Sequence, residues 1–379
     1  MMTPMTGRAT AAAAAAAIMA GTTVHVGSAR TAHVLAERAC SGAWSVVASP
    51  AVPGGELDAV APRAGDDVWA VGAVPSSFAG SRKRRRPLVE HWDGRRWTVV
   101  PSARVSGELD AVAAIAADDA WAVGWSEDVP ALIEHWDGRS WNRVAVPWPA
   151  RLRGVAATSA TDVWAVGSND SGALVLHWDG TRWSRVARRQ KASLEAVVAL
   201  SATDVWAVGG QDGDGLLALH WNGVRWRAFV KPGPGDAKSL DAVAAFSSRD
   251  VWAVGSYHEE EAPGYVNHGV VLHWNGSTWT HKRAPQGRAL LAVAAGPPHE
   301  LWVATFDLFP FAAGGGAGTS LTRLGAQWDV TELPRRLVLG LARQPGGTVW
   351  GVGLVGSGID EGGDGFPIRT APLVLRSTC

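Results

Sequence analysis

Histidine and aspartate recur along this chain as regularly as a metal site or an acid–base site would require. A His stands directly before a Trp at His91, His135, His177, His220 and His273. An Asp stands two residues before another Trp at Asp67, Asp119, Asp162, Asp204 and Asp250. Equivalent positions of a repeat lie on a ring and do not converge on one ion. We therefore interpret the histidines as hydrogen-bonded structural residues and the aspartates as turn residues, and expect no metal.

Other charged groups allow more than one interpretation. The Gly- and acid-rich stretch 356–365 offers oxygen ligands for calcium at Asp360, Glu361 and Asp364, but it lacks the spacing of a calcium loop, so a solvated loop is favoured. The basic run 82–86 suits anionic polymers or is simply solvated. A glycosidase needs two facing carboxylates, and the sequence leaves open whether loop acids such as Glu127, Asp128, Asp212 and Asp214 form a pair. No spacing typical of a bound cofactor is present.

Aromatic side chains outside the repeat are the best candidates for ligand contacts. Of 21 Trp, all but Trp125 and Trp148 occupy repeat positions. Both are expected in connections on one face, where an indole can stack on a sugar ring or pack against its own loop. Tyr257 and Tyr265, in a long loop, are further candidates.

The elements that position these residues are short strands. The stretch 194–226 (LEAVVALSATDVWAVGGQDGDGLLALHWNGVRW) shows apolar runs of strand length bounded by Gly, Asp, Asn and Ser. A Leu or Val precedes the Trp of the next strand by 12 residues in seven pairs, beginning Leu57/Trp69 and ending Val338/Trp350. Five pairs from Trp92/Trp97 to Trp274/Trp279 are joined through Asp-Gly or Asn-Gly, which favours a tight hairpin. Four strands at this period predict an all-β, seven-bladed propeller with four-stranded blades.

Variation in length indicates the binding face. The gap from the second-strand Trp to the third-strand Trp is 23, 15, 14, 15 and 22 residues in the first five copies. Because the strands alternate in direction, this connection and the connection between blades emerge on the same face. Loops of variable length on a rigid scaffold are where binding residues concentrate, so we expect the binding site there.

The two ends of the chain are expected to meet. The segment 40–48 resembles an isolated fourth strand, and 338–376 supplies only three strands, so the N-terminal strand is predicted to close the last blade. Aligning Trp44 with Trp97 and Leu375 with Glu90 places Cys40 beside Cys379. These are the two Cys of the chain, and we predict a disulfide between them.

The N-terminus and the charge restrict location and partner. Residues 1–36, with Arg8 before the apolar run 9–20, read as a secretory signal peptide, or as an unstructured Ala-rich tail. Residues 37–379 would then form the propeller, secreted and without a membrane span. The net charge of zero argues against a dedicated nucleic-acid binder. We expect a monomer.

The motif DVWAVG followed by LHWDGxxW resembles secreted bacterial propellers built of WAVG/HWDG repeats. It is also similar to tectonin-type propeller lectins, and more distantly to Asp-box propellers that include sialidases. The resemblance covers residues 40–379 and implies fold more strongly than function. The Asp-box spacing is not kept, because Asp179 and Gly180 are adjacent, and the only two Tyr stand close together.

The sequence thus favours a non-catalytic propeller that binds carbohydrate or a cell-surface polymer through its variable loop face. The alternatives are a secreted glycan-active hydrolase or lyase and a protein-interaction module. A facing carboxylate pair would favour the enzyme. An aromatic pocket between blades would favour the lectin, and a broad apolar patch would favour the protein-interaction module.

Overall fold

The computed structural model describes residues 43–75, 85–212, 215–232, 239–261, 264–285, 288–296, 300–307, 318–324, 328–333, 336–345, 347–359 and 367–377. The chain divides into two compact units, Met1–Ala36 and Glu37–Cys379, and every described residue belongs to the second. No helix that could span a membrane occurs among these residues.

Seven four-stranded antiparallel sheets make up the fold, as predicted. We number the blades in chain order. Blade 1 holds β2 (Glu56–Ala64), β3 (Asp67–Pro75), β4 (Arg85–Trp92) and β5 (Trp97–Val99). Blade 2 holds β6 (Gly107–Ala116), β7 (Asp119–Ser126), β8 (Leu132–Trp136) and β9 (Trp141–Arg143). Blade 3 holds β10 (Arg151–Ser159), β11 (Asp162–Asn169), β12 (Gly172–Trp178) and β13 (Trp183–Arg189). Blade 4 holds β14 (Ala192–Ser201), β15 (Asp204–Gln211), β16 (Gly215–Trp221) and β17 (Trp226–Pro232).

The remaining blades follow the same order. Blade 5 holds β18 (Ser239–Ser247), β19 (Asp250–Glu261), β20 (Gly264–Trp274) and β21 (Trp279–Lys282). Blade 6 holds β22 (Ala289–Gly296), β23 (Glu300–Asp307), β24 (Gly318–Leu324) and β25 (Trp328–Leu333). Blade 7 holds β26 (Arg336–Arg343), β27 (Val349–Ile359), β28 (Pro367–Ser377) and β1 (Trp44–Val46).

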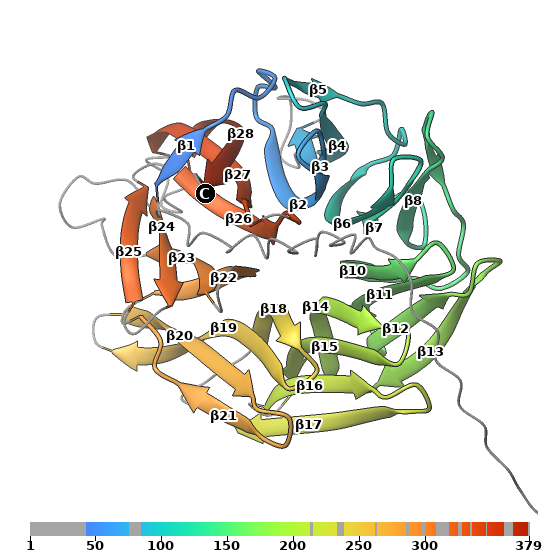
Figure 1. Ribbon diagram of the computed structural model, residues 1–379, viewed down its shortest axis with the longest axis vertical. Coiled ribbons are helices and arrows are strands. Elements are labelled where there is room, and N and C mark those ends of the chain that lie inside the picture. Colours follow the sequence, from blue (N-terminus) through green and yellow to red (C-terminus); the bar gives the residue numbers. More distant parts are fainter. Residues whose placement is uncertain are drawn as a thin grey trace, which may run out of the picture. The chain divides into compact units, whose positions relative to one another are not determined.

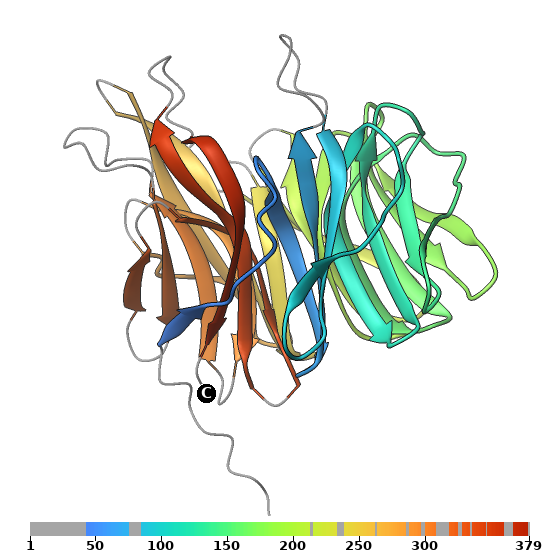
Figure 2. The same cartoon turned by 90° about the horizontal axis from the view of Figure 1, so that it is seen from above.

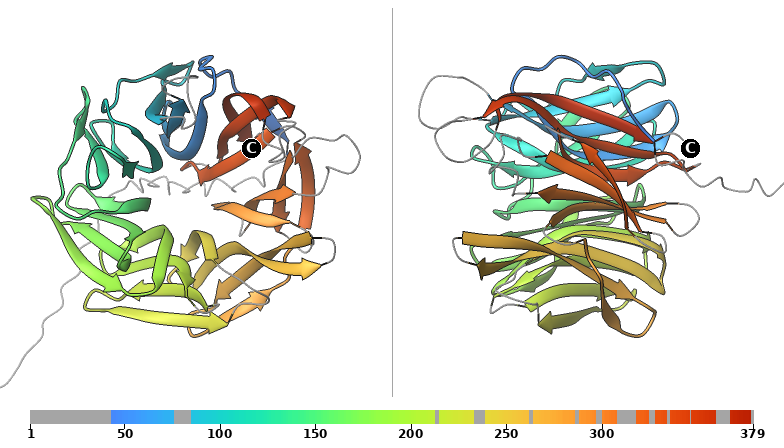
Figure 3. Two further views of the ribbon diagram at one scale, coloured as in Figure 1. Left: turned by 180° about the vertical axis from the view of Figure 1, so that it is seen from behind. Right: turned by 90° about the vertical axis from the view of Figure 1, so that its left-hand side faces the viewer.

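The sheets stand around a ring with the first strand of each blade innermost (Figure 1). Each inner strand contacts the inner strand of the next blade, and β26 of blade 7 contacts β2 of blade 1. Side views show the strands running between the two faces of the ring (Figures 2 and 3). The hairpins that join second to third strands therefore share a face with the connections between blades.

Blade 7 takes its outer strand from the other end of the chain. β1 pairs antiparallel with β28, with Trp44 opposite Ser377 and Val46 opposite Leu375. Trp44 also packs edge-on against Trp302 of blade 6, with ring centroids 5.3 Å apart. Cys40 and Cys379 lie outside the described residues, so their disulfide stays a prediction.

The spacing of 12 residues joins two core residues on neighbouring strands, which pack on opposite sides of the blade. Leu57 and Trp69 are 0% and 1% exposed, and the equivalent residues are buried in the other blades except Trp252, which is partly buried. Leu57 lies opposite Gly72 of the WAVG motif, and a Cβ on Gly72 would overlap the carbonyl oxygen of Glu56. The Gly is required because the two backbones approach closely there.

The predicted tight hairpins between third and fourth strands are present. In blade 3, Asp179 Oδ1 accepts hydrogen bonds from the backbone N–H groups of Thr181 and Arg182, each at 2.9 Å. Gly180 follows with a φ of +90°, which favours glycine. The side-chain bond from the Thr181 hydroxyl, followed by these backbone bonds, lowers the pKa of Asp179 to about 2.

Candidate binding surface

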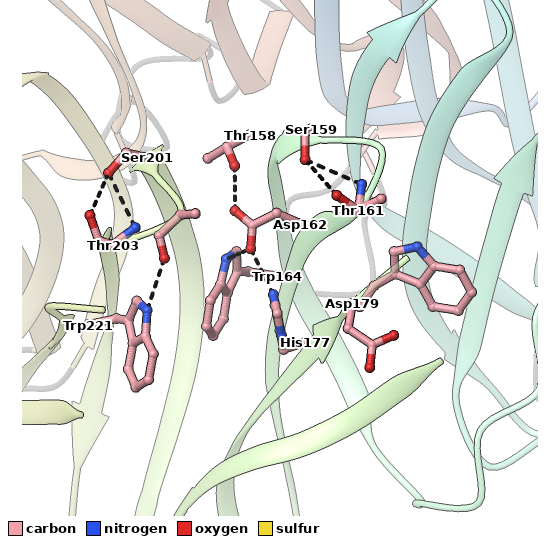
Figure 4. Close-up of polar contacts among 12 residues, drawn as sticks. Thr158, Ser159, Thr161, Asp162, Trp164, His177, Asp179, Ser201, Thr203 and Trp221 are labelled. Carbon is pink, nitrogen blue, oxygen red and sulfur yellow. Dashed lines mark hydrogen bonds and ion pairs between the residues drawn. The ribbon is translucent and has the colours of Figure 1, made fainter. Parts of the chain in front are cut away.

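The recurring histidines and aspartates form one structural unit in each of blades 1 to 5. Each His donates or accepts one hydrogen bond with the Asp of its own blade, at 2.7–2.9 Å. Each imidazole also lies against the second-strand Trp, with ring centroids 4.1–4.4 Å apart. Figure 4 shows this in blade 3, where Asp162 Oδ1 accepts from Trp164 at 3.0 Å and contacts His177 Nε2 at 2.7 Å. These groups hold strands together, and no group of three or more His, Cys, Asp or Glu in the described part could hold a metal.

A bulge in the inner strands creates a set of residues that the sequence analysis missed. In every blade the pairing of the first two strands shifts by one residue directly after the buried Leu or Val. The extra residues are Asp58, Asp110, Arg153, Glu195, Asp241, Leu291 and Leu339. Bulges re-aim side chains and are common beside functional sites. The available signal was a charged residue within an otherwise apolar run, directly after its Leu, in five of the seven blades.

The bulge residues of blades 2 to 4 form an ion-pair network. Arg153 Nη1 donates to Asp110 Oδ1 at 2.9 Å, and Arg153 Nε lies 3.8 Å from Glu195 Oε2. Burial raises the pKa of Asp110 to about 7, although Arg153 opposes the rise. Burial likewise raises the pKa of Asp241 to about 7. Burial, followed by repulsion from Glu56 and Asp110, raises the pKa of Asp58.

Trp125 lies in a second charged cluster, at the ends of the inner strands. It is the penultimate residue of β7 and not part of a loop, because β6 and β7 stay paired as far as Gly107 and Ser126. Its Nε1–H donates to Glu108 Oε1 at 2.5 Å, and the guanidinium of Arg151 lies 4.3 Å from its ring centroid. Arg85 joins this cluster through Glu108, at 2.9 Å, and through Glu56. The indole N–H and one ring face of Trp125 are therefore already engaged.

The structure describes two residues of the basic run 82–86, Arg85 and Arg86. Arg85 is paired with two carboxylates, and Arg86 is exposed. Residues 82–84 of the run lie outside the described residues, as do Asp360, Glu361 and Asp364. The run and the acidic stretch therefore keep both of their interpretations.

Trp148 lines an open hollow of about 360 Å³ at the outer edge of blade 3. It lies in the connection between β9 and β10, and the other lining residues are Arg182, Trp183, Ser184 and Arg185. The Arg185 guanidinium is 6.0 Å from the Trp148 ring centroid. Trp148 is only partly buried, and one side packs on the apolar core between blades 2 and 3. The hollow thus combines a held indole with cationic donors and a hydroxyl.

The two Trp outside the repeat are not brought together. Trp125 is bound among inner-strand residues, whereas Trp148 lies beside the outermost strand of the next blade. Tyr257 belongs to β19 and Tyr265 to β20, so both lie in a long hairpin and not in a loop. The Tyr257 ring stacks on His268, with centroids 4.9 Å apart, and also packs on the core of blades 4 and 5.

A polar hollow of about 420 Å³ opens between blades 3 and 4 on the face of the variable loops. Its lining includes Asp170, Arg188, Gln190, Lys191 and Asp212. Lys191 has a φ of +53°, and among the described residues it is the one non-glycine with positive φ. Such strain, on the order of 1–3 kcal/mol, often marks functional sites. A narrower cleft of about 170 Å³ adjoins it and reaches Trp226.

Comparison with known proteins identifies the fold and no family. No model of a known protein family matches this chain, and no curated protein matches it. Among solved structures, YCF48 from Cyanidioschyzon merolae is similar over 89% of this chain and 99% of its own, at 15% identity and a TM-score of 0.56. U3-55K is similar over 89% of this chain and 98% of its own, at 16% identity and a TM-score of 0.59. A GH74 xyloglucanase from Xanthomonas campestris is similar over 82% of this chain and 53% of its own, at 17% identity and 0.53. At such identities these matches support the propeller fold alone.

Proposed function

We propose that this protein is a secreted, non-catalytic propeller that binds carbohydrate, and that blade 3 carries the binding surface. The observation that carries the proposal is the hollow at Trp148. Sugar rings stack on indoles, and their hydroxyl groups need donors and acceptors at the edge of that platform. Arg182, Ser184 and Arg185 supply these groups around a Trp whose other side is held by the core.

The polar hollow between blades 3 and 4 supports the same proposal. Asp170, Gln190 and Asp212 present planar carboxyl and amide groups to a space large enough for a sugar ring. Both hollows lie along β13, since Arg185 lines one and Arg188 the other. A ligand of more than one sugar unit could contact both.

The competing functions have weaker support. Asp110, whose pKa of about 7 suits a general acid, is bound to Arg153 and is only 11% exposed. The exposed large apolar side chains of the described residues are single Val or Leu residues: Val46, Val99, Val186, Leu200, Val224, Val230, Val330 and Val355. They are spread over blades 1, 3, 4, 6 and 7, which favours no broad protein interface.

The test is a glycan-array screen of the secreted, folded chain beside Trp148→Ala and Trp125→Ala. We expect retention by the wild type, loss of retention in Trp148→Ala with unchanged thermal stability, and a smaller effect of Trp125→Ala. A parallel hydrolase panel should show no turnover of any retained glycan. Absence of retention, or turnover abolished by Asp110→Asn, would contradict the proposal.

A further inference from the structure

The outer strands of blades 2 to 4 carry a local excess of positive charge. The chain as a whole has a net charge of zero. The segment 138–150, which precedes and includes the outer strand of blade 2, nevertheless contains Arg139 and Arg143 and no acid, and residues 180–194 contain four Arg, Lys191 and no acid. We define the basic rim by six exposed arginines on or directly before the outer strands of blades 2 to 4: Arg143, Arg182, Arg185, Arg188, Arg225 and Arg227.

The acids nearest to the rim neutralise little of it. Asp179 begins the hairpin turn before β13 and uses its Oδ1 to bind turn N–H groups, while its other oxygen is 3.8 Å from Arg182 Nε. Arg185 and Arg188 have no ion pair in the part of the chain that the structure describes. Asp170 and Asp212 line the polar hollow at the far end of β13. The middle of the strand is therefore cationic.

Two of the arginines of β13 lie in a row on one face of the sheet. Arg185 pairs with Leu176 and Arg188 with Leu174 on the neighbouring strand, so both arginines lie on the face of the sheet that carries the Leu pair packed toward blade 2. Seven residues of strand span about 23 Å. Strand β13 begins at the Trp148 hollow and ends at the polar hollow. An extended polymer could therefore bind in both hollows and contact these arginines of β13 between them.

We propose that the ligand is an acidic, linear polysaccharide, with carboxylate or sulfate groups, that lies along β13 on the basic rim. This inference rests on the proposed carbohydrate function and specifies the class of glycan. Guanidinium groups pair with carboxylates and sulfates in a planar, two-point geometry. The indole of Trp148 provides the stacking platform that a sugar polymer uses. A polymer of repeating charge fits a row of cations better than a single ion does.

The test compares one polymer with and without its charge. Polygalacturonate and its fully methyl-esterified form share a backbone, and a single-stranded oligothymidylate provides a polyanion without sugar-ring carboxylates. Affinity is measured by isothermal titration at fixed ionic strength. The variant Arg182→Gln/Arg185→Gln/Arg188→Gln is compared with Arg95→Gln/Arg96→Gln/Lys282→Gln, which removes the same charge at exposed sites outside the rim.

We expect the wild type to bind polygalacturonate at least about tenfold more tightly than the ester, and the rim variant to lose that advantage. The control variant should keep it, and both variants should melt as the wild type does. Equal affinity for the charged polymer and its ester, equal effects of the two variants, or equally tight binding of oligothymidylate would overturn the inference. If neutral glycans still depend on Trp148 in that case, the carbohydrate function stands; if no glycan is bound, both fail.

Discussion

The carboxyl group of Glu90 accepts a hydrogen bond of 2.6 Å from the hydroxyl of Ser49, at a site where Glu90 is 0% exposed. Ser49 lies in the connection from β1 to β2, so this bond links the N-terminal segment to blade 1. Glu134 and Ser102 form the same pair one blade later, at 2.9 and 3.0 Å. In blade 3 the equivalent positions are Leu176 and Val146, which share an apolar core.

Glu90 should make stability depend on pH. Burial raises its pKa from 4.5 to about 7, with the Ser49 bond acting against the rise. The folded protein therefore binds more protons than the unfolded chain between these values, so this contribution is complete below pH 4.5 and is lost as the pH rises through 7. The shift corresponds to at most about 3 kcal/mol.

The measurement is urea unfolding of wild type and Glu90→Gln at pH 5 and pH 8. We expect the free energy of unfolding to fall less between these values in Glu90→Gln than in the wild type. Glu127→Gln, at an exposed loop carboxyl, should behave as the wild type. If the free energy of unfolding depended on pH in the same way in Glu90→Gln and wild type, Glu90 would have the same pKa in the folded and unfolded states, which would contradict this prediction.

The buried Glu–Ser pairs should be replaceable by the apolar pair of blade 3. Ser102→Ala removes a donor from the buried carboxyl group of Glu134 and should cost about 1–2 kcal/mol. The double variant Glu134→Leu/Ser102→Val should recover part of that loss, because buried polar pairs are often matched by apolar ones. It also leaves the backbone N–H of Ala103, which donates to Glu134 at 3.2 Å, without this acceptor, so we expect a stability between those of Ser102→Ala and the wild type. The free energies of unfolding of the single and double variants are measured by chemical denaturation. A double variant less stable than Ser102→Ala would refute this reasoning.

The structural role of the Asp residues can be graded between blades. Asp162 forms hydrogen bonds with His177, Trp164 and the hydroxyl of Thr158, whereas Asp204 forms one only with His220, at 2.8 Å, among the described residues. We expect Asp162→Ala to lower the free energy of unfolding by about 2–3 kcal/mol and Asp204→Ala by about 1–2. Thermal melts should show no effect of a chelator on either. A chelator-dependent melt would instead indicate a metal in these units.

The predicted disulfide has a direct chemical test. The pair Trp44 and Ser377 lies four and two residues from Cys40 and Cys379. A bond closing so long a loop is expected to contribute on the order of 4–5 kcal/mol in the chain-entropy description. Thiol labelling of the unfolded, unreduced protein should find no free thiol, and reduction should lower the melting temperature. Two labelled thiols per chain would exclude the bond.

The repeat allowed the fold to be predicted because all seven blades keep the Leu or Val and the Trp at one spacing, and five of them turn at Asp-Gly or Asn-Gly. The functional residues were harder to predict, since their roles depend on contacts between blades. Trp125 and Trp148 look alike in the sequence, yet Glu108 and Arg151 engage the first while the second lines an open hollow. The bulge at Asp110 had only a weak signal, a charged residue within an apolar run, and the strain at Lys191 arises from backbone geometry that no local pattern reveals.

Carbohydrate binding at the Trp148 hollow is tested most directly by titrating the best-retained glycan into wild type, Trp148→Ala and Trp148→Phe. Val224→Ala, at an exposed apolar residue of blade 4, is the control. We expect Trp148→Ala to weaken binding at least about tenfold, Trp148→Phe to weaken it less because a smaller ring still stacks, and Val224→Ala to bind as the wild type. Unchanged affinity in a folded Trp148→Ala protein would contradict the account.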